Sequence, residues 1–325
     1  MTGIDDVDQF IKIIDWTAGH AEISRRACVF LNLIWSGLEF TVKEIKSVAI
    51  LGAGAMGTMY ASKFVDSGHI VPAFVASGTR YEKLKSQECL VIGKKYAVPV
   101  IHPAHATEPV DLIIVAVKNH QLEEAAKDLA SLVGAETTIL SVMNGLDSEE
   151  FLGSMFGMDK ILYAIALGMD AVREGGSVSY SNPGKILFGK ADNSVLSDRV
   201  IAIQNAFRNS GIQCDTPVDM IRMMWWKFMI NVGVNQASAV MRAPYGVFHA
   251  SRDAQELMSD LMREVITLAQ HSDVRLDDQD LVNWYPVLHG LGPEGKTSML
   301  QDIEAKRKTE VEVFAGKVVR RFPGV

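Results

Sequence analysis

The feature that constrains this chain most is a glycine-rich turn placed between an apolar run and a helix-forming segment. The apolar residues 48–51 lead directly into Gly52-Ala-Gly-Ala-Met-Gly57, and residues 58–66 predict a helix. In such a turn the first glycine permits the tight bend, the second lets the backbone approach a pyrophosphate, and the third lets the helix pack closely on the strand. The phosphates then lie at the helix N-terminus, where free N–H groups favour an anion. We therefore predict a dinucleotide-binding domain; the alternative is a glycine turn in another kind of α/β unit.

Length and composition exclude several classes of protein. The 325 residues suffice for two domains, and a net charge of −7 without a basic block argues against nucleic acid as a partner. No apolar run reaches the roughly 20 residues of a membrane helix, so we expect no membrane association. The three cysteines, Cys28, Cys89 and Cys214, form no CxxC pair. This spacing argues against a disulfide framework or a zinc site and favours a cytoplasmic location.

The glycine turn starts late, because 46 residues precede the strand that leads into it. Within them, the apolar segment 27–40 is interrupted by polar residues and follows an acidic start. We therefore favour an added amphipathic helix or a mis-assigned gene start over a signal sequence. The predicted organisation is an N-terminal extension (1–46), a Rossmann-type NADP-binding domain (47–217) and a helical substrate and catalytic domain (218–325).

The end of the second predicted strand, residues 69–76, bears on the choice of cofactor. Pro72 in this strand predicts an edge position or an irregular start. An NAD-selective site places an acidic residue after the strand to hold the ribose 2′-hydroxyl. Here Ser77 and Arg80 follow, with no acid before Glu82. Because a guanidinium can grip a 2′-phosphate with two hydrogen bonds, we predict NADPH/NADP⁺; the alternative is a solvated arginine in a polar loop.

Two further predicted strands are each followed by a polar side chain, and we expect both side chains at the same edge of the sheet. The apolar runs 111–117 and 137–143 are typical of parallel strands buried on both faces, and they end at Lys118 and Asn144. Open α/β sheets bind ligands at these strand ends, so we expect both side chains beside the nicotinamide. Alternatively, each is a loop residue that satisfies local backbone groups. The other predicted elements before the boundary at Pro217 are a hairpin or crossover at 89–102, helices at 123–132 and 195–210, strands at 161–169, 176–180 and 186–189, and a short link at 212–217.

Beyond this boundary the helical period dominates. In the predicted helix 224–240, Lys227, Asn231 and Asn235 recur every four residues and form one stripe in apolar surroundings. Because unpartnered buried polar groups are costly, we interpret the stripe as the lining of a pocket rather than a solvated face. The predicted fold is therefore α/β, with a Rossmann-type N-terminal domain followed by an all-α C-terminal domain.

A second polar stripe is predicted near the end of the chain. Residues 297–310 are typical of a helix, with Ser298, Asp302 and Glu310 at helical repeats. Most of its other charges fit a solvated face with local ion pairs. Spacing alone does not single out Glu310.

At these residues the chain resembles the ketopantoate reductases, also called 2-dehydropantoate 2-reductases, over residues 47–320. The resemblance implies NADPH-dependent reduction of ketopantoate to pantoate in pantothenate and coenzyme A biosynthesis. The stretches that carry it are Gly52–Gly57, Val117-Lys118, Asn144-Gly145, Trp226-Lys227 with Asn231 and Asn235, and Ser298–Asp302 followed by Thr309-Glu310.

The resemblance also implies a role for each of these residues. Lys227 is the general acid that protonates the developing alkoxide, and Glu310 orients it or the substrate. Burial lowers the pKa of Lys227 while Glu310 opposes this, so the net shift stays open. The implied substrate-binding residues are Asn144, Asn231, Asn235, Ser298, Lys118 at the cofactor–substrate junction, and Asp302 in support. The implied cofactor-binding residues are Gly52, Ala53, Gly54, Ala55, Met56, Gly57, Ser77, Arg80, Lys118 and Asn144.

The chain departs from the family pattern at three places. Ser77 stands where an arginine is usual, with Arg80 three residues later, so the phosphate grip is rearranged. Met143 precedes Asn144 where a polar residue is common. The sequence ends after residues 320–325, where the family usually continues with a loop and a helix. We expect this short end to leave apolar surface of the second domain uncovered, with instability, aggregation or a covering partner as the consequence. The N-terminal extension is a candidate to cover this surface instead.

Three alternatives to a ketopantoate reductase stay open. Two are enzymes of the same architecture: a related NADP-dependent 2-keto acid reductase, or an opine-type dehydrogenase. The third is an inactive paralogue that binds the cofactor as a sensor. The expected partner is a small-molecule 2-keto acid. A homodimer is compatible with the resemblance, although the sequence itself gives no oligomeric state.

Overall fold

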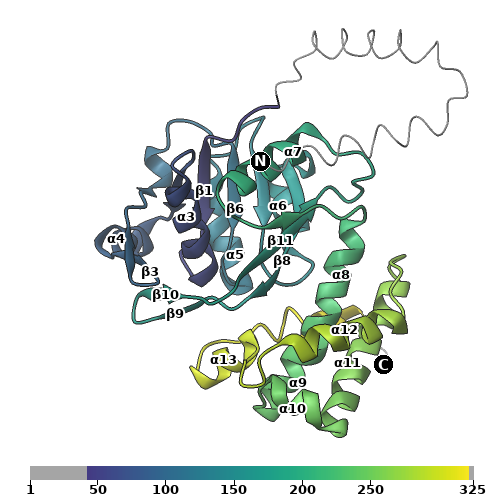
Figure 1. The fold of residues 1–325 in the computed structure, drawn as a ribbon. Helices are drawn as coiled ribbons and strands as arrows, with labels where there is room; N and C mark the ends of the chain where they lie inside the picture. Colours follow the sequence, from purple (N-terminus) through teal and green to yellow (C-terminus); the bar gives the residue numbers. More distant parts are fainter. Residues whose placement is uncertain (1–41, 322–325) are drawn as a thin grey trace, which may run out of the picture. The chain divides into compact units, whose positions relative to one another are not determined.

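The glycine turn follows a strand in the interior of an eight-stranded sheet. The structure is a computed structural model that describes residues 42–321 (Figure 1). In it, β1 (Ser47–Leu51) pairs in parallel with β2 (Val71–Val75) on one side and β6 (Leu112–Val115) on the other. The strand order is β12-β11-β8-β7-β6-β1-β2-β5. The last four residues of β1 are buried, as expected for a central parallel strand.

The rest of this sheet follows the Rossmann-type order. Every neighbouring pair is parallel except β8 and β11, which form an antiparallel pair. The remaining strands are β5 (Val100–Ile101), β7 (Thr138–Ser141), β8 (Ile161–Met169), β11 (Pro183–Gly189) and β12 (Cys214–Asp215). The helices of this half are α3 (Ala55–Ser67), α4 (Gly78–Ser86), α5 (Asn119–Ala125), α6 (Ser148–Phe156), α7 (Asp198–Asn209) and the short turns η1 (Pro103–His105), η2 (Ala126–Leu129) and η3 (Met158–Lys160). The α/β prediction with a Rossmann-type first half is confirmed.

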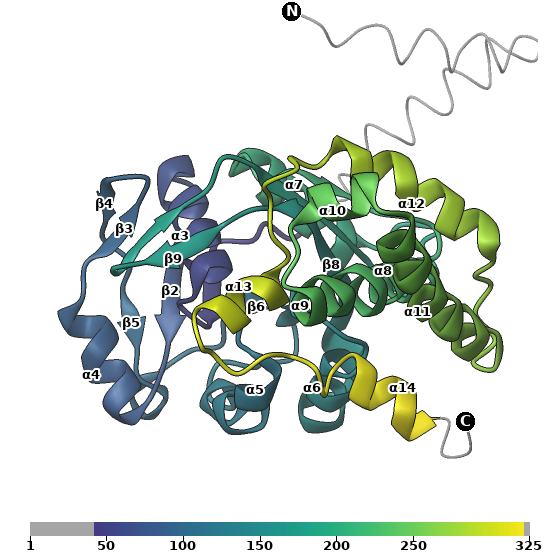
Figure 2. The same ribbon diagram turned by 90° about the horizontal axis from the view of Figure 1, so that it is seen from below.

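A second, four-stranded sheet lies beside α3 (Figure 2). Its order is β4-β3-β10-β9, and both β3 and β10 contact α3. The strands are β3 (Cys89–Val91), β4 (Lys94–Tyr96), β9 (Val172–Glu174) and β10 (Ser177–Ser179). β3 and β4 form the hairpin expected within 89–102, whereas β9 and β10 belong to an extension of the β8–β11 pair.

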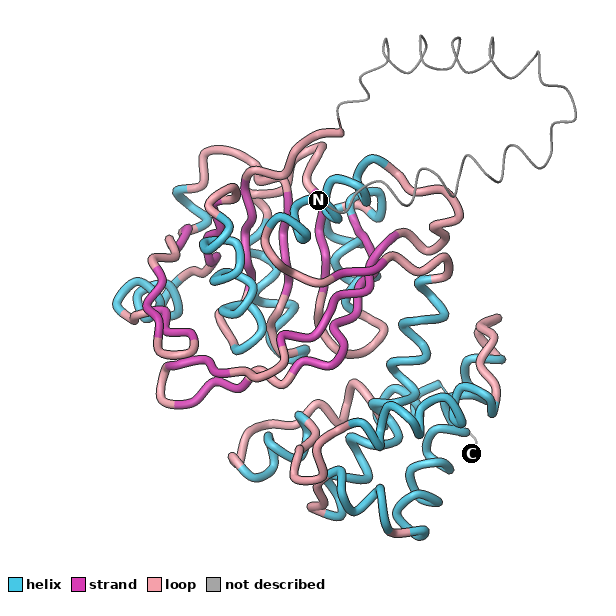
Figure 3. Tube along the Cα trace, in the orientation of Figure 1, coloured by secondary structure: helices cyan, strands magenta, loops and turns pink. Residues whose placement is uncertain are grey.

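Residues 220–321 are helices and loops (Figure 3). The helices are α8 (Met220–Ile230), the π-helical segment η4 (Asn231–Asn235), α9 (Gln236–Met241), α10 (Tyr245–Ala250), α11 (Arg252–Gln270), α12 (Asp278–Gly290), α13 (Ser298–Glu304) and α14 (Ala315–Arg321). Their core includes the fully buried Phe228, Met258 and Phe314. Gly233 lets η4 approach α11, because a Cβ there would lie 2.5 Å from Met262 Cγ. Residues 43–321, the described part of the chain from Lys43 onward, pack together compactly.

One prediction about the sheet half was wrong, and at two other places the structure excludes one of the alternatives. Of the two alternatives for Pro72, the edge position is excluded, because β2 pairs with β1 on one side and with β5 on the other. β5 pairs only with Phe74 and Val75, so Pro72 lies before the segment that faces it. The link 212–217 contains a strand, β12, which extends the sheet beside β11. At Arg80 the alternative of a polar loop does not apply, because Arg80 lies on α4, which begins at Gly78.

Two predictions about the helical half also require correction. The helix predicted over 224–240 is interrupted by η4, so the polar stripe winds through a wider turn than an α-helix has. α13 ends at Glu304, because Lys306 has a φ of 53° in the left-handed region. Glu310 therefore lies in the loop after α13 and not on a helical stripe.

Some predictions lie outside the described residues. They include the amphipathic helix at 27–40, most of the extension 1–46, and the consequences expected from residues 322–325. Among the described residues, no helix combines the length and apolarity needed to cross a membrane.

Candidate active site

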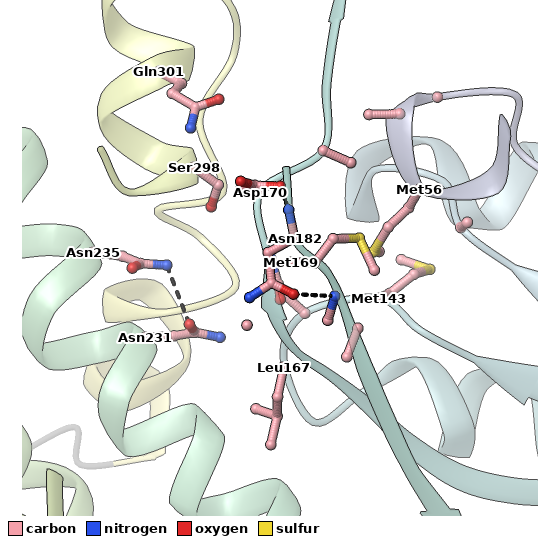
Figure 4. Close-up of a pocket in the computed structure, with 18 of the residues that line it drawn as sticks. Met56, Met143, Leu167, Met169, Asp170, Asn182, Asn231, Asn235, Ser298 and Gln301 are labelled. Carbon is pink, nitrogen blue, oxygen red and sulfur yellow. Dashed lines mark hydrogen bonds between the residues drawn. The ribbon is translucent and has the colours of Figure 1, made fainter. Parts of the chain in front are cut away.

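A cleft of about 1650 Å³ lies between the carboxyl ends of the central strands and the helices that follow. This is where open α/β sheets bind ligands, and the volume accommodates a dinucleotide together with a small substrate. Side chains from both halves face it (Figure 4). The close-up shows Asn231, Asn235, Ser298 and Gln301 on one side and Met56, Met143, Leu167 and Met169 on the other.

The three glycines of the turn meet different surroundings. Gly52 has a φ of 113°, and a Cβ there would lie 2.5 Å from the Ala116 carbonyl oxygen. A Cβ on Gly57 would lie 1.9 Å from the Gly52 carbonyl oxygen. Gly54 has nothing within 4 Å of its Cβ position, and it lines the cleft just before α3. The outer glycines are therefore required by packing, whereas the middle one leaves room for a ligand.

The end of the cleft beside α4 carries two cationic side chains. Arg80 lies in the first turn of α4 and lines the cleft, as does Lys83 one turn later. Neither forms an ion pair with a carboxylate of the described residues. Lys83 was missed by the sequence analysis, although its spacing of three residues from Arg80 on a helix could have indicated it. Ser77 precedes α4 and does not line the cleft.

The strand ends meet two buried carboxylates from the C-terminal half. Lys118 Nζ lies 2.9 Å from Asp302 Oδ2 and 3.6 Å from Glu310 Oε2. Asn144 Nδ2 donates to the same Glu310 oxygen at 3.1 Å. Glu310 lines the cleft, whereas Asp302 lies behind it and also accepts from Arg307 Nε at 2.8 Å. The structure thus joins Lys118, Asn144 and Glu310 into one network that links the two halves.

The amide of Asn231 has an unused donor at the cleft. Asn235 Nδ2 donates to Asn231 Oδ1 at 3.2 Å, which fixes the orientation of the Asn231 amide (Figure 4). Asn231 Nδ2 is buried and has no hydrogen-bond partner in the described part of the protein. Because leaving a buried donor unsatisfied costs about 1–3 kcal/mol, this group favours a ligand with an oxygen acceptor.

Lys227 lies one turn before Asn231 and lines the same cleft. Burial lowers the pKa of its ammonium to about 8, against the opposing effects of Glu310 and Glu149. Glu149 is buried beneath the site, where burial raises its pKa to about 7 and a hydrogen bond of 2.9 Å from Ser148 opposes the shift. At Lys227 the lowering of the pKa by burial therefore outweighs its raising by the two carboxylates, a balance that the sequence alone left open. An ammonium with a pKa near neutrality can give up a proton in a reaction.

Further residues complete the walls of the cleft. Ser298, the first residue of α13, is exposed toward it, and Gln301 lies one turn later. Trp226, Ile230 and Val234, each one position before a residue of the polar stripe, add an apolar wall. Arg173 reaches the glycine turn from β9. Sequence periodicity gave no signal for Arg173, because its neighbours are distant in the chain.

Comparisons with known proteins agree with this geometry. Residues 48–193 match the family model described as ketopantoate reductase PanE/ApbA, and residues 219–321 match the model of its C-terminal domain. The 2-dehydropantoate 2-reductase of Archaeoglobus fulgidus is 26% identical over 86% of this chain and 91% of the relative. The structure of 2-dehydropantoate 2-reductase from Geobacter metallireducens aligns with a TM-score of 0.74 and 26% identity, over 85% and 92% of the two chains. A D-mandelate dehydrogenase in complex with NADH shares the fold, with a TM-score of 0.76 and 20% identity over 85% and 92%.

Proposed function

Because the chain belongs to the ketopantoate reductase family and is therefore a dinucleotide-dependent oxidoreductase, we propose that it uses NADPH to reduce 2-dehydropantoate (ketopantoate) to pantoate. This reaction serves pantothenate and coenzyme A biosynthesis. The observation that carries the proposal is the arrangement of the cleft. The ammonium of Lys227 and the unused amide donor of Asn231 line the same cleft as the glycine turn.

The residues at the turn fit a dinucleotide. Gly54 leaves open space next to the first turn of α3, which contains no acidic residue to repel phosphate. Arg80 and Lys83 supply positive charge at the ribose end without carboxylate partners among the described residues. The bound cofactor supplies the hydride for the carbonyl carbon of the substrate. We propose that these residues hold its phosphates and that Lys118 and Asn144 lie at its nicotinamide end.

In this proposal the helical half contributes the proton donor and the residues that bind the substrate. We propose that Lys227 donates a hydrogen bond to the ketone oxygen and then its proton to the developing alkoxide, which its positive charge also stabilises. Asn231 Nδ2 donates to a hydroxyl or carboxylate oxygen of the substrate, with Asn235 holding its orientation. Glu310, fixed by Asn144 and Lys118, maintains the charged form of Lys227.

Oxidation of NADPH with a panel of 2-keto acids tests the proposed substrate. We expect ketopantoate to give the highest kcat/KM, with 2-ketoisovalerate and phenylglyoxylate as comparison substrates. The apolar wall around Trp226 and the fold shared with a D-mandelate dehydrogenase make the aromatic acid a stringent comparison. A higher kcat/KM for another acid would contradict the proposed substrate but keep the reductase assignment. Binding of NADPH without turnover of any acid would favour an inactive paralogue.

Arg80→Ala tests the proposed preference for NADPH. A charge-assisted hydrogen bond contributes about 1.5–3 kcal/mol, so we expect the KM for NADPH to rise about 10- to 100-fold while the KM for NADH changes little. Lys85→Ala is the matched control, because Lys85 lies on the same helix, is exposed and does not line the cleft. An unchanged KM for NADPH in Arg80→Ala would contradict the assignment. The homodimer and the cytoplasmic location stay predictions.

A further inference from the structure

A cationic side chain outside the glycine motif contacts the turn directly. Arg173 Nη1 donates to the carbonyl oxygen of Ala53, the residue between the first two glycines, and lies 3.3 Å from Thr58 Oγ1. Arg173 lines the cleft together with Ala53 and Gly54. Its guanidinium therefore stands at the place where the turn and the start of α3 leave room for a ligand.

The position of Arg173 is set by a tight hairpin. β9 and β10 are joined by Gly175 and Gly176, which have φ values of 55° and 92°, as the central residues of a type I′ turn require. In the register of this pair Arg173 lies opposite Val178, which is fully buried. Cross-strand partners point to the same face of a sheet. Because β10 contacts α3, this face is the one that carries Arg173 to the glycine turn.

The base of the hairpin is held by Asp170. Its Oδ1 accepts from the backbone N–H groups of Ser181 at 3.0 Å and Asn182 at 2.8 Å, just where the chain returns toward β11. β8 and β11, which carry the hairpin, are paired over most of their length. The hairpin is therefore an arm anchored in the main sheet, and Arg173 stands on it.

The charge of Arg173 is not neutralised by a carboxylate of the described residues. Lys118, Lys185 and Lys296 also line the cleft, but each pairs with an acidic side chain. A guanidinium has five N–H donors, and the contacts to Ala53 and Thr58 both involve Nη1. Donors thus remain for a planar, two-point interaction with phosphate oxygens.

We propose that Arg173 is a binding residue for the pyrophosphate of the dinucleotide, supplied by the β9–β10 arm in addition to the glycine turn. This inference rests on the proposed use of a dinucleotide, but not on the identity of the keto acid. It also assigns two arginines that line the cleft to different groups: Arg80 to the 2′-phosphate and Arg173 to the pyrophosphate.

Arg173→Gln and Arg173→Lys test this assignment by calorimetric titration. The ligands are NADPH, 2′,5′-ADP, which keeps the 5′-phosphate, and 2′-AMP, which lacks it. In Arg173→Gln we expect the dissociation constants of NADPH and 2′,5′-ADP to rise about 10- to 100-fold and that of 2′-AMP to stay unchanged. Arg173→Lys keeps the charge but loses the planar pair of N–H donors. Its dissociation constants should therefore lie between those of the wild type and of Arg173→Gln. The dependence of NADPH binding on salt should also weaken in Arg173→Gln.

Lys63→Gln is the matched control. Lys63 lies on α3, contacts the ring of Tyr180 and does not line the cleft, so removing its charge should leave all three dissociation constants unchanged. Unchanged binding of NADPH and 2′,5′-ADP in Arg173→Gln would overturn the proposal. An equal rise in the dissociation constant of 2′-AMP would also overturn it. Arg173 would then bind the 2′-phosphate or maintain the conformation of the glycine turn. The thermal unfolding of the ligand-free variants checks their fold. Failure of ketopantoate turnover in the wild type would leave these binding results intact, so the two proposals fail separately.

Discussion

Lys227→Ala is expected to lower kcat about 10³-fold and to leave the dissociation constant of NADPH nearly unchanged. The substitution removes the proton donor, a contribution of about 10²–10⁴-fold, and with it the positive charge beside the ketone oxygen. Lys227 lies on α8, far along the chain from the glycine turn that is proposed to hold the cofactor. The measurements are steady-state NADPH oxidation with ketopantoate and a fluorescence titration of NADPH.

The pH dependence gives a second signature of the same residue. Burial lowers the pKa of Lys227 to about 8, and the reaction needs the protonated form. For the wild type we therefore expect kcat/KM to be constant below this pH and to fall tenfold per pH unit above it. In Lys227→Arg the side chain stays protonated over the whole pH range of the assay, so the alkaline decrease should disappear even if the rate is lower.

Lys227→Met separates the loss of the ammonium from the loss of packing, because methionine fills much of the same volume. We expect it to lose as much activity as the alanine variant while unfolding at a temperature closer to that of the wild type. Lys127→Ala, a change at an exposed lysine outside the cleft, serves as the unaffected control. Retention of kcat within threefold in Lys227→Ala would exclude Lys227 as the proton donor.

The parts of the site that sequence could predict are those fixed by neighbouring strands or by one helix. Lys118 and Asn144 follow β6 and β7, which are adjacent and parallel, so chain order alone places them together. Asn231 and Asn235 are hydrogen-bonded at a spacing of four residues, as the helical period indicated. In both cases the geometry follows from local backbone structure.

The remaining parts depend on contacts between distant segments, which periodicity does not report. Glu310 reaches Asn144 from an irregular loop, and its predicted helical spacing was wrong because α13 ends at Glu304, before the left-handed residue Lys306. Arg173 reaches Ala53 because a two-glycine turn pairs β9 with β10, which contacts α3. Family resemblance singled out Glu310, whereas Arg173 required the structure.

Gly57→Ala is expected to prevent the glycine turn from forming its native structure. Its Cβ would lie 1.9 Å from the Gly52 carbonyl oxygen and 3.1 Å from Ile50 Cγ2, so the backbone of the turn directly after the central strand would have to move. We expect a loss of about 3 kcal/mol in the free energy of unfolding and no measurable binding of NADPH. Chemical denaturation and a fluorescence titration measure the two effects.

Gly54→Ala is the matched comparison, and we expect it to weaken the binding of NADPH without lowering the free energy of unfolding. Gly54 has a φ of −74° and nothing within 4 Å of its Cβ position, so alanine fits the ligand-free protein and the free energy of unfolding should change by less than about 0.5 kcal/mol. The methyl group would, however, occupy the space that the pyrophosphate needs. We therefore expect at least about tenfold weaker binding of NADPH in a stable protein. Full affinity in Gly54→Ala would mean that the phosphates do not approach the backbone at this glycine, and the proposed contact between Arg173 and the pyrophosphate would then lose its basis as well.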